Sequence, residues 1–311
     1  MELRRLGASG LKVSEVGLGC NNFGMRIDQE KTQDVIDAAI EAGINFFDTA
    51  DVYGASQSEV MLGNALGERR KDVILATKFA APMGGSPYQR GGSRRYIITA
   101  VEASLKRLGT DYVDLYQMHR PDADTPIEET LMALDDLVRA GKVRYIGNSN
   151  FTGWQIADAS WIAKSGHLTP FVSAQNNYSL LERGVEKEVT PACEHFGLGL
   201  LPYFPLASGM LTGKYRRAEP PPEGTRLAAF GRRGAEALSD AAFDKVDKLK
   251  AWTEERGHTL LELAFAWLLG HSIVPSVIAG ATSAEQVKAN AGAAAWKLTP
   301  AEVAEVTQLV S

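Results

Sequence analysis

The chain has 311 residues, of which 45% are hydrophobic and 23% charged, with a formal net charge of −5. This composition is typical of a globular protein, and the slight acidity argues against a broad surface for nucleic acid or anionic membranes. No apolar run approaches the ~20 residues that span a bilayer, and the N-terminus lacks the apolar region of a signal peptide. With two cysteines, we expect no disulfide framework and a cytoplasmic location.

From residue 15 onward, short runs of β-branched and aromatic residues alternate with amphipathic stretches, a pattern that predicts repeated βα units. In chain order, the predicted strand and helix pairs are Glu15–Gly19 with 31–42, Ile44–Asp48 with 58–67, Val73–Lys78 with 93–108, Val113–Met118 with 127–140, Val143–Asn148 with 153–164, Val172–Gln175 with 185–196, Gly199–Tyr203 with 259–270, and Val274–Ile278 with 283–290. About eight such units favour an α/β fold closed into a (β/α)8 TIM barrel over an open parallel sheet.

Three further segments complete the expected fold. The first 14 residues are expected to form an N-terminal hairpin with its turn at Gly7–Gly10. This hairpin would cover the bottom of the barrel. Residues 204–258 form a long loop after strand 7, with a helix near 241–256, and loops of this length are often functional lids. A C-terminal helix follows Thr299, because Pro300 suits the first helical position. No shift in composition marks a boundary, so we expect a single domain over residues 1–311.

Polar side chains gather at the predicted carboxyl ends of the strands, where the active site of a barrel lies. The residues at these ends are Cys20, Asn21, Asp48, Lys78, His119, Ser149, Asn150, Gln175, Tyr203 and Gly280. Packing alone does not select Asp, Lys, His, Asn and Gln in succession after buried strands. The pattern therefore predicts a reactive site at this end of the barrel.

Asp48, Lys78 and His119 end consecutive strands, and Tyr53 lies in the loop after the first of them. A lysine ammonium beside Tyr53 favours the phenolate, so we expect the pKa of the tyrosine to fall below its usual ~10. Asp48 would hold the ammonium, and His119 would orient a substrate oxygen. Each residue alone has an ordinary structural explanation, but together these four predict a catalytic group that protonates an oxygen, as in carbonyl reduction. The histidines and cysteines show no spacing typical of a metal site.

Five motifs closely resemble the aldo-keto reductase family. They are Gly43–Gly54 with the run FDTADVYG, Leu105–Gly109, Asp111–Tyr116, His119–Asp122 and Gly147–Phe151. The chain is most similar to the branch that contains bacterial general reductases and potassium-channel β subunits. The resemblance implies a nicotinamide cofactor bound across the barrel mouth and a small-molecule carbonyl or alcohol substrate.

The resemblance assigns cofactor contacts to the strand ends, to the segment after strand 7 and to the last barrel helix. These residues are Cys20, Asn21, Asp48, Ser149, Asn150, Gln175, Tyr203, Phe204, Pro205, Leu206, Ser208, Lys214, Arg226, Gly280, Thr282, Gln286 and Asn290. Ser149, Asn150 and Gln175 would hold the nicotinamide carboxamide, and Tyr203 would stack on its ring. The segment from Phe204 to Lys214 would line the pyrophosphate.

The cofactor is expected to be NADP(H), with NAD(H) as the alternative. Short-loop reductases carry a Lys-Ser pair and an arginine around the 2′-phosphate, where this chain has Gly280, Ala281 and Gln286. Arg226, Lys214 and the Thr282 hydroxyl can replace those contacts. The last barrel helix would receive the adenosine end, since a helix N-terminus favours phosphate.

The substrate pocket is expected to include Phe23, Tyr53, Met83, Tyr88 and His119, and to be partly aromatic. The identity of the substrate and the oligomeric state cannot be read from the sequence. Two other functions remain open. One is a nicotinamide-binding regulatory subunit with little turnover, although the channel β subunits have asparagine in the place of His119. The other is a barrel isomerase or aldolase that needs no nicotinamide.

Overall fold

A computed structural model describes residues 1–229, 231–232, 234 and 238–311 of the chain. Its centre is an eight-stranded parallel sheet in the order β10-β3-β4-β5-β6-β7-β8-β9, and β9 and β10 lie against each other where the barrel closes. The strands are β3 (Val16–Gly19), β4 (Phe46–Asp48), β5 (Ile74–Phe79), β6 (Val113–Met118), β7 (Val143–Ser149), β8 (Phe171–Asn177), β9 (Gly199–Tyr203) and β10 (Val277–Gly280). This arrangement confirms the predicted (β/α)8 barrel.

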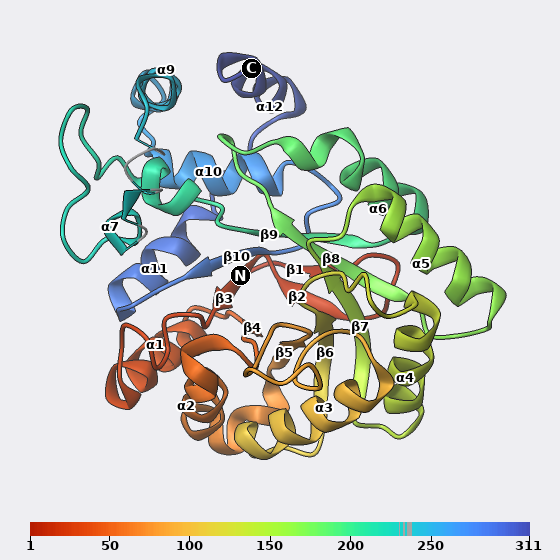
Figure 1. Ribbon diagram of the computed structural model, residues 1–311. Coiled ribbons are helices and arrows are strands. Elements are labelled where there is room, and N and C mark those ends of the chain that lie inside the picture. Colours follow the sequence, from red (N-terminus) through yellow and green to blue (C-terminus); the bar gives the residue numbers. More distant parts are fainter. Residues whose placement is uncertain (230, 233, 235–237) are drawn as a thin grey trace.

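Eight helices surround the strands (Figure 1). They are α1 (Gln29–Glu41), α2 (Gln57–Leu66), α3 (Arg94–Leu108), α4 (Ile127–Arg139), α5 (Gly153–Ser165), α6 (Val189–Phe196), α10 (Leu260–Leu269) and α11 (Ala284–Ala293). Their ends follow local chemistry. For example, Thr259 and Glu262 form a capping box at the start of α10, and Gly109 ends α3 in a left-handed conformation.

The last strand differs from its prediction. The sequence pattern predicts a strand over Val274–Ile278. In the structure, the strand that pairs with β3 begins at Val277 and ends at Gly280. Pro275 lies before the strand, where its missing N–H removes no ladder bond. The shift places Gly280 at the carboxyl end of β10, beside the mouth of the barrel. The predicted helix over 185–196 is also divided, into the 3₁₀ turn η3 (Gly184–Lys187) and α6.

The hairpin β1 (Leu3–Arg5) and β2 (Lys12–Ser14) lies across the barrel axis (Figure 1). Leu6 and Val13 from this segment are fully buried against inward side chains of the strands, including Phe46 and Leu115. The hairpin therefore plugs one end of the barrel with apolar side chains, as predicted, and leaves the opposite end for the polar residues.

The segment after β9 contains the 3₁₀ turn η4 (Ala207–Thr212), α7 (Arg226–Ala229) and α9 (Asp240–Glu254). Residues 230, 233 and 235–237 of the predicted long loop lie outside the described residues. The chain ends with α12 (Pro300–Leu309), whose Pro300 begins the helix as predicted. None of the helices described is both long and apolar enough to cross a bilayer.

Candidate active site

Strand alternation turns three polar side chains toward the barrel axis. Asp48 ends β4, Lys78 lies near the end of β5, and His119 follows β6, with its backbone N–H bonded to the Phe79 carbonyl at 2.9 Å. In a barrel strand, every second side chain points inward. Phe46 accordingly belongs to the barrel interior, so Asp48, two residues later, points to the same side. The predicted strand ends therefore meet at one mouth.

Tyr53 begins a tight turn, η1 (Tyr53–Ser56), between β4 and α2. Gly54 makes this turn possible, since its φ is +57° and a Cβ atom there would lie 2.7 Å from the Phe23 carbonyl oxygen. The turn directs the Tyr53 ring toward the Lys78 ammonium, whose nitrogen lies 5.1 Å from the ring centroid.

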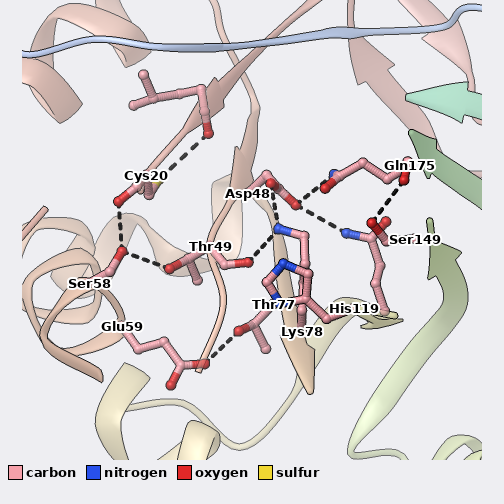
Figure 2. Close-up of polar contacts among 12 residues, drawn as sticks. Cys20, Asp48, Thr49, Ser58, Glu59, Thr77, Lys78, His119, Ser149 and Gln175 are labelled. Atoms are coloured by element: carbon pink, nitrogen blue, oxygen red, sulfur yellow. Dashed lines mark hydrogen bonds and ion pairs between the residues drawn. The ribbon is translucent and has the colours of Figure 1, made fainter. Parts of the chain in front are cut away.

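Asp48 and Lys78 form a buried ion pair (Figure 2). The Lys78 ammonium of this pair faces the Tyr53 ring. The Lys78 Nζ to Asp48 Oδ2 distance is 2.6 Å, and Nζ also donates to the Thr49 carbonyl at 2.8 Å. Burial favours the neutral amine, but the Asp48 carboxylate and Tyr53 more than offset it and raise the pKa of Lys78. The lysine is therefore a fixed cation at the base of the cleft.

The pKa of Tyr53 changes in the direction opposite to the sequence prediction. Burial raises the pKa of Tyr53, and the Lys78 ammonium offsets only part of that increase, while the Asp48 carboxylate adds to it. The prediction was wrong because it considered the nearby charge and not the loss of solvent. At neutral pH, the hydroxyl therefore keeps its proton.

His119 stands edge-on to Tyr53, with 5.6 Å between the ring centroids. Burial, together with the positive charges of Lys78 and Arg120, lowers the pKa of His119 to about 3. Its Nδ1 atom is buried and has no hydrogen-bond partner among the described residues. The ring is therefore a neutral imidazole at the mouth.

A cleft of about 820 Å³ opens over this group. Every residue of the predicted cofactor set except Cys20 lines it, so the structure brings together Asn21, Asp48, Ser149, Asn150, Gln175, Tyr203, Phe204, Pro205, Leu206, Ser208, Lys214, Arg226, Gly280, Thr282, Gln286 and Asn290. Tyr53 and His119 line the same cleft. Cys20 lies just beneath it, is fully buried, and has a pKa raised well above the usual value by burial.

The wall beyond His119 is a chain of hydrogen bonds. Tyr203 donates its hydroxyl to Asn150 Oδ1 at 2.8 Å, and the Asn150 amide donates to the His119 carbonyl at 2.9 Å. Ser149 Oγ donates to the Gln175 carbonyl, and Gln175 Nε2 donates to Asp48 Oδ1 at 3.1 Å (Figure 2). These side chains offer both hydrogen-bond donors and hydrogen-bond acceptors, which suits the binding of a carboxamide.

Three cations converge farther along the cleft. Burial and the charges of Arg26 and Arg226 lower the pKa of Lys214, and burial and the charge of Arg26 lower the pKa of Arg226. Arg26 also donates to the Gly224 carbonyl of the long loop. Among the described residues, no carboxylate forms an ion pair with these three side chains, so an anion would relieve their repulsion.

The far end of the cleft is the start of α11, where Ser283 caps the helix. Gln286 Oε1 accepts from the Thr282 backbone at 2.9 Å, and Asn290 is nearly buried one turn later. Unpaired N–H groups at a helix start favour a ligand with negative charge.

Three predicted substrate residues lie outside the cleft. Phe23 is fully buried in the core, where its turn pairs with Ile27. Met83 packs against the core, and Tyr88 is 63% exposed under the Arg95 guanidinium. Nearness in sequence does not show which loop side chains point inward. Phe23 enters the core although its neighbours Asn22 and Arg26 line the cleft.

Several residues of the site were not predicted from the sequence. Arg26 and Asn22 line the cleft, and Gln117 donates to Asp48 from beneath it at 3.0 Å. Arg26 could have been predicted as a site residue, because it lies in the loop that follows the first barrel strand. Gln117 was hidden within a strand, where only the fold shows its direction.

Residues 15–311 match the model of the aldo/keto reductase family. Relatives include a probable voltage-gated potassium channel subunit beta of Oryza sativa (38% identical, covering 93% of this chain and 90% of the relative). They also include the uncharacterized oxidoreductase YrpG of Bacillus subtilis (38%; 93% and 89%) and a probable aldo-keto reductase of Glycine max (37%; 98% and 88%). With the barrel and its polar mouth, these matches show that the chain belongs to the aldo/keto reductase family.

Proposed function

We propose that this protein reduces an aldehyde or ketone to the alcohol, and catalyses the reverse oxidation, with NADP(H) as cofactor. The observation that carries the proposal is the buried Asp48–Lys78 pair directly beneath Tyr53, with neutral His119 beside it at the closed end of the cleft. The three cations support a phosphorylated dinucleotide, and their number favours NADP(H) over NAD(H).

The bound nicotinamide supplies the hydride in this reaction. The residues of the chain handle the substrate oxygen. Tyr53 is protonated at neutral pH and donates its proton as the carbonyl becomes an alkoxide. Lys78 stabilises the phenolate that remains, and Asp48 keeps the ammonium in place. Neutral His119 orients the carbonyl without competing for the proton.

Tyr53→Phe tests the proposal. It removes the donated proton and keeps the ring, so kcat for NADPH-dependent reduction of a reactive aldehyde should fall about a hundredfold or more, with little change in the Kd for NADPH. Tyr88→Phe is the matched control, since Tyr88 is exposed outside the cleft. Full activity in purified Tyr53→Phe would refute the mechanism. Parallel titration with NADH tests the cofactor preference.

The relatives named as potassium channel subunits favour a second candidate, a nicotinamide-binding regulatory subunit. Tight binding of NADPH with negligible turnover over a panel of aldehydes, ketones and sugars would support it. His119 beside Tyr53 favours turnover, because a substrate oxygen would meet both groups.

A further inference from the structure

The carboxylate of Asp48 is held by side chains from three different strands. Lys78 of β5 contacts Oδ2 at 2.6 Å, while Gln117 of β6 and Gln175 of β8 donate to Oδ1 at 3.0 and 3.1 Å. The two oxygens thus have different partners, because Oδ1 accepts from neutral amides and Oδ2 accepts from the ammonium. These contacts determine how the carboxylate is rotated about its bond to Cβ.

Gln117 is fully buried and does not line the cleft. Its Nε2 atom donates to Asp48, and its Oε1 atom has no hydrogen-bond partner among the described residues. An unpaired buried amide oxygen lowers the stability of the folded state, and an apolar side chain of similar size would avoid that loss. Packing alone therefore does not explain a glutamine at this position.

The backbone leaves space for this side chain. Gln117 pairs with Lys78 on one side and with Gly147 on the other. A Cβ atom at Gly147 would lie 3.2 Å from the Gln117 Cγ atom and 2.2 Å from Ser173 Oγ. Because Gly147 in β7 has no Cβ atom, the Gln117 side chain has room to reach Asp48.

Gln175 occupies a different position, because it lines the cleft. In the proposed function it also binds the nicotinamide carboxamide, so its amide serves two partners. Gln117 does not line the cleft, and within the part of the chain that the structure describes its amide donates to Asp48 alone. Gln117 is therefore the Oδ1 donor that a bound cofactor does not engage directly.

We propose that Gln117 is a positioning residue whose amide holds the Asp48 carboxylate so that Oδ2 stays on Lys78 and the ammonium stays beside Tyr53. Its effect on turnover rests on the proposed function. When Gln117 is replaced by an apolar side chain, Oδ1 of Asp48 keeps only the Gln175 donor, so the carboxylate is held less firmly. The ammonium then moves with the carboxylate, and Tyr53 becomes a weaker acid.

The test compares Gln117→Leu and Gln117→Met with wild type in NADPH-dependent reduction across a pH range. We expect kcat to fall about tenfold, the alkaline limb of the pH profile to move to higher pH, and the Kd for NADPH to stay unchanged. Asn148→Leu is the matched control, since Asn148 is also a buried amide with an unpaired oxygen but does not contact Asp48. Asn148→Leu should leave the alkaline limb of the pH profile unchanged.

The proposal would be overturned if the Gln117 variants had the kcat of the wild type and the same alkaline limb in the pH profile. So would a lower kcat with an unmoved limb, which indicates a structural role only. If neither variant folds, NMR of the wild-type side-chain amides decides. NADPH should perturb Gln175 and leave the Gln117 amide protected from exchange, and loss of that protection would overturn the proposal.

The result does not depend on turnover. If the wild type reduces no carbonyl, the proposed function fails, and the titration of Tyr53 followed by NMR of isotope-labelled tyrosine still tests Gln117. Tyr53→Phe identifies the signal. Gln117→Leu should shift its midpoint to higher pH, and an unchanged midpoint would count against the positioning role.

Discussion

At the residue scale, the central feature is a lysine with no exposed surface next to a nearly buried aspartate. Removing one partner of such a pair leaves an uncompensated charge in a poorly polarisable interior, whereas removing both leaves none. Stability and catalysis can therefore be separated at this pair, because only catalysis needs the ammonium itself.

Lys78→Met should abolish reduction and lower the free energy of unfolding by about 3–5 kcal/mol, because Asp48 loses its counterion. The double variant Lys78→Met/Asp48→Leu should regain most of the stability and none of the activity. Urea unfolding with aldehyde reduction measures both. If the double variant is no more stable than the single one, the Asp48 charge is not the source of the loss.

The sequence identified Asp48, Lys78 and His119 because each follows a strand, and the barrel brings strand ends together. It did not yield the direction of the Tyr53 pKa, because that depends on burial, a property of the assembled site. Gln117 was missed for a related reason, as its hydrogen bond to Asp48 joins two different strands.

At the element scale, a polar cluster joins η1, α2 and α3 to the strands. Burial and the neighbouring Glu59 carboxylate raise the pKa of Asp51 to about 7, while Tyr96 donates to Asp51 at 3.3 Å. Glu59 itself accepts from Thr77 and pairs with Arg107. The cluster lies behind the turn that carries Tyr53.

This cluster predicts a pH dependence of stability. Asp51 has a higher pKa in the folded chain, about 7, than the ordinary value of 3.8 for an aspartate, so the folded state holds the extra proton between these values. Its contribution is therefore present below the unfolded pKa and is lost as the pH rises toward 7, with a slope of up to about 1.4 kcal/mol per pH unit. Denaturant titrations should show Asp51→Asn with a flatter profile. An identical slope in both proteins would contradict the assignment.

Strands were predicted well where the apolar run and the pairing coincide, as in β6 and β9. β10 was misplaced because its bounds depend on register with β3, which lies near the N-terminus in sequence but beside β10 in space. Register between distant segments is a tertiary property and leaves little trace in a local pattern.

At the scale of the whole molecule, the two ends of the barrel have different tasks. The hairpin closes one end with apolar contacts, and the cleft opens at the other. The alternation of strands and helices was enough to predict this architecture, while the paths of the loops around the mouth, including those of Met83 and Tyr88, were not encoded in any periodic pattern.

Leu6→Ala should demonstrate this division. Leu6 is fully buried in the plug, so its truncation should lower the free energy of unfolding by about 2–5 kcal/mol. Under conditions where the variant stays folded, kcat and the Kd for NADPH should match the wild type. Reduced kcat in the folded variant would mean that the plug influences the mouth.

The burial of the thiols has a practical consequence. Cys20, under the mouth, and Cys193, in α6, are both fully buried, and burial raises the pKa of each. Thiol reagents attack the thiolate, so neither sulfur reacts until its surroundings open. The rate of alkylation at each position then reports local opening on one side of the barrel, and the chain carries two natural probes of its own breathing motions without any added label.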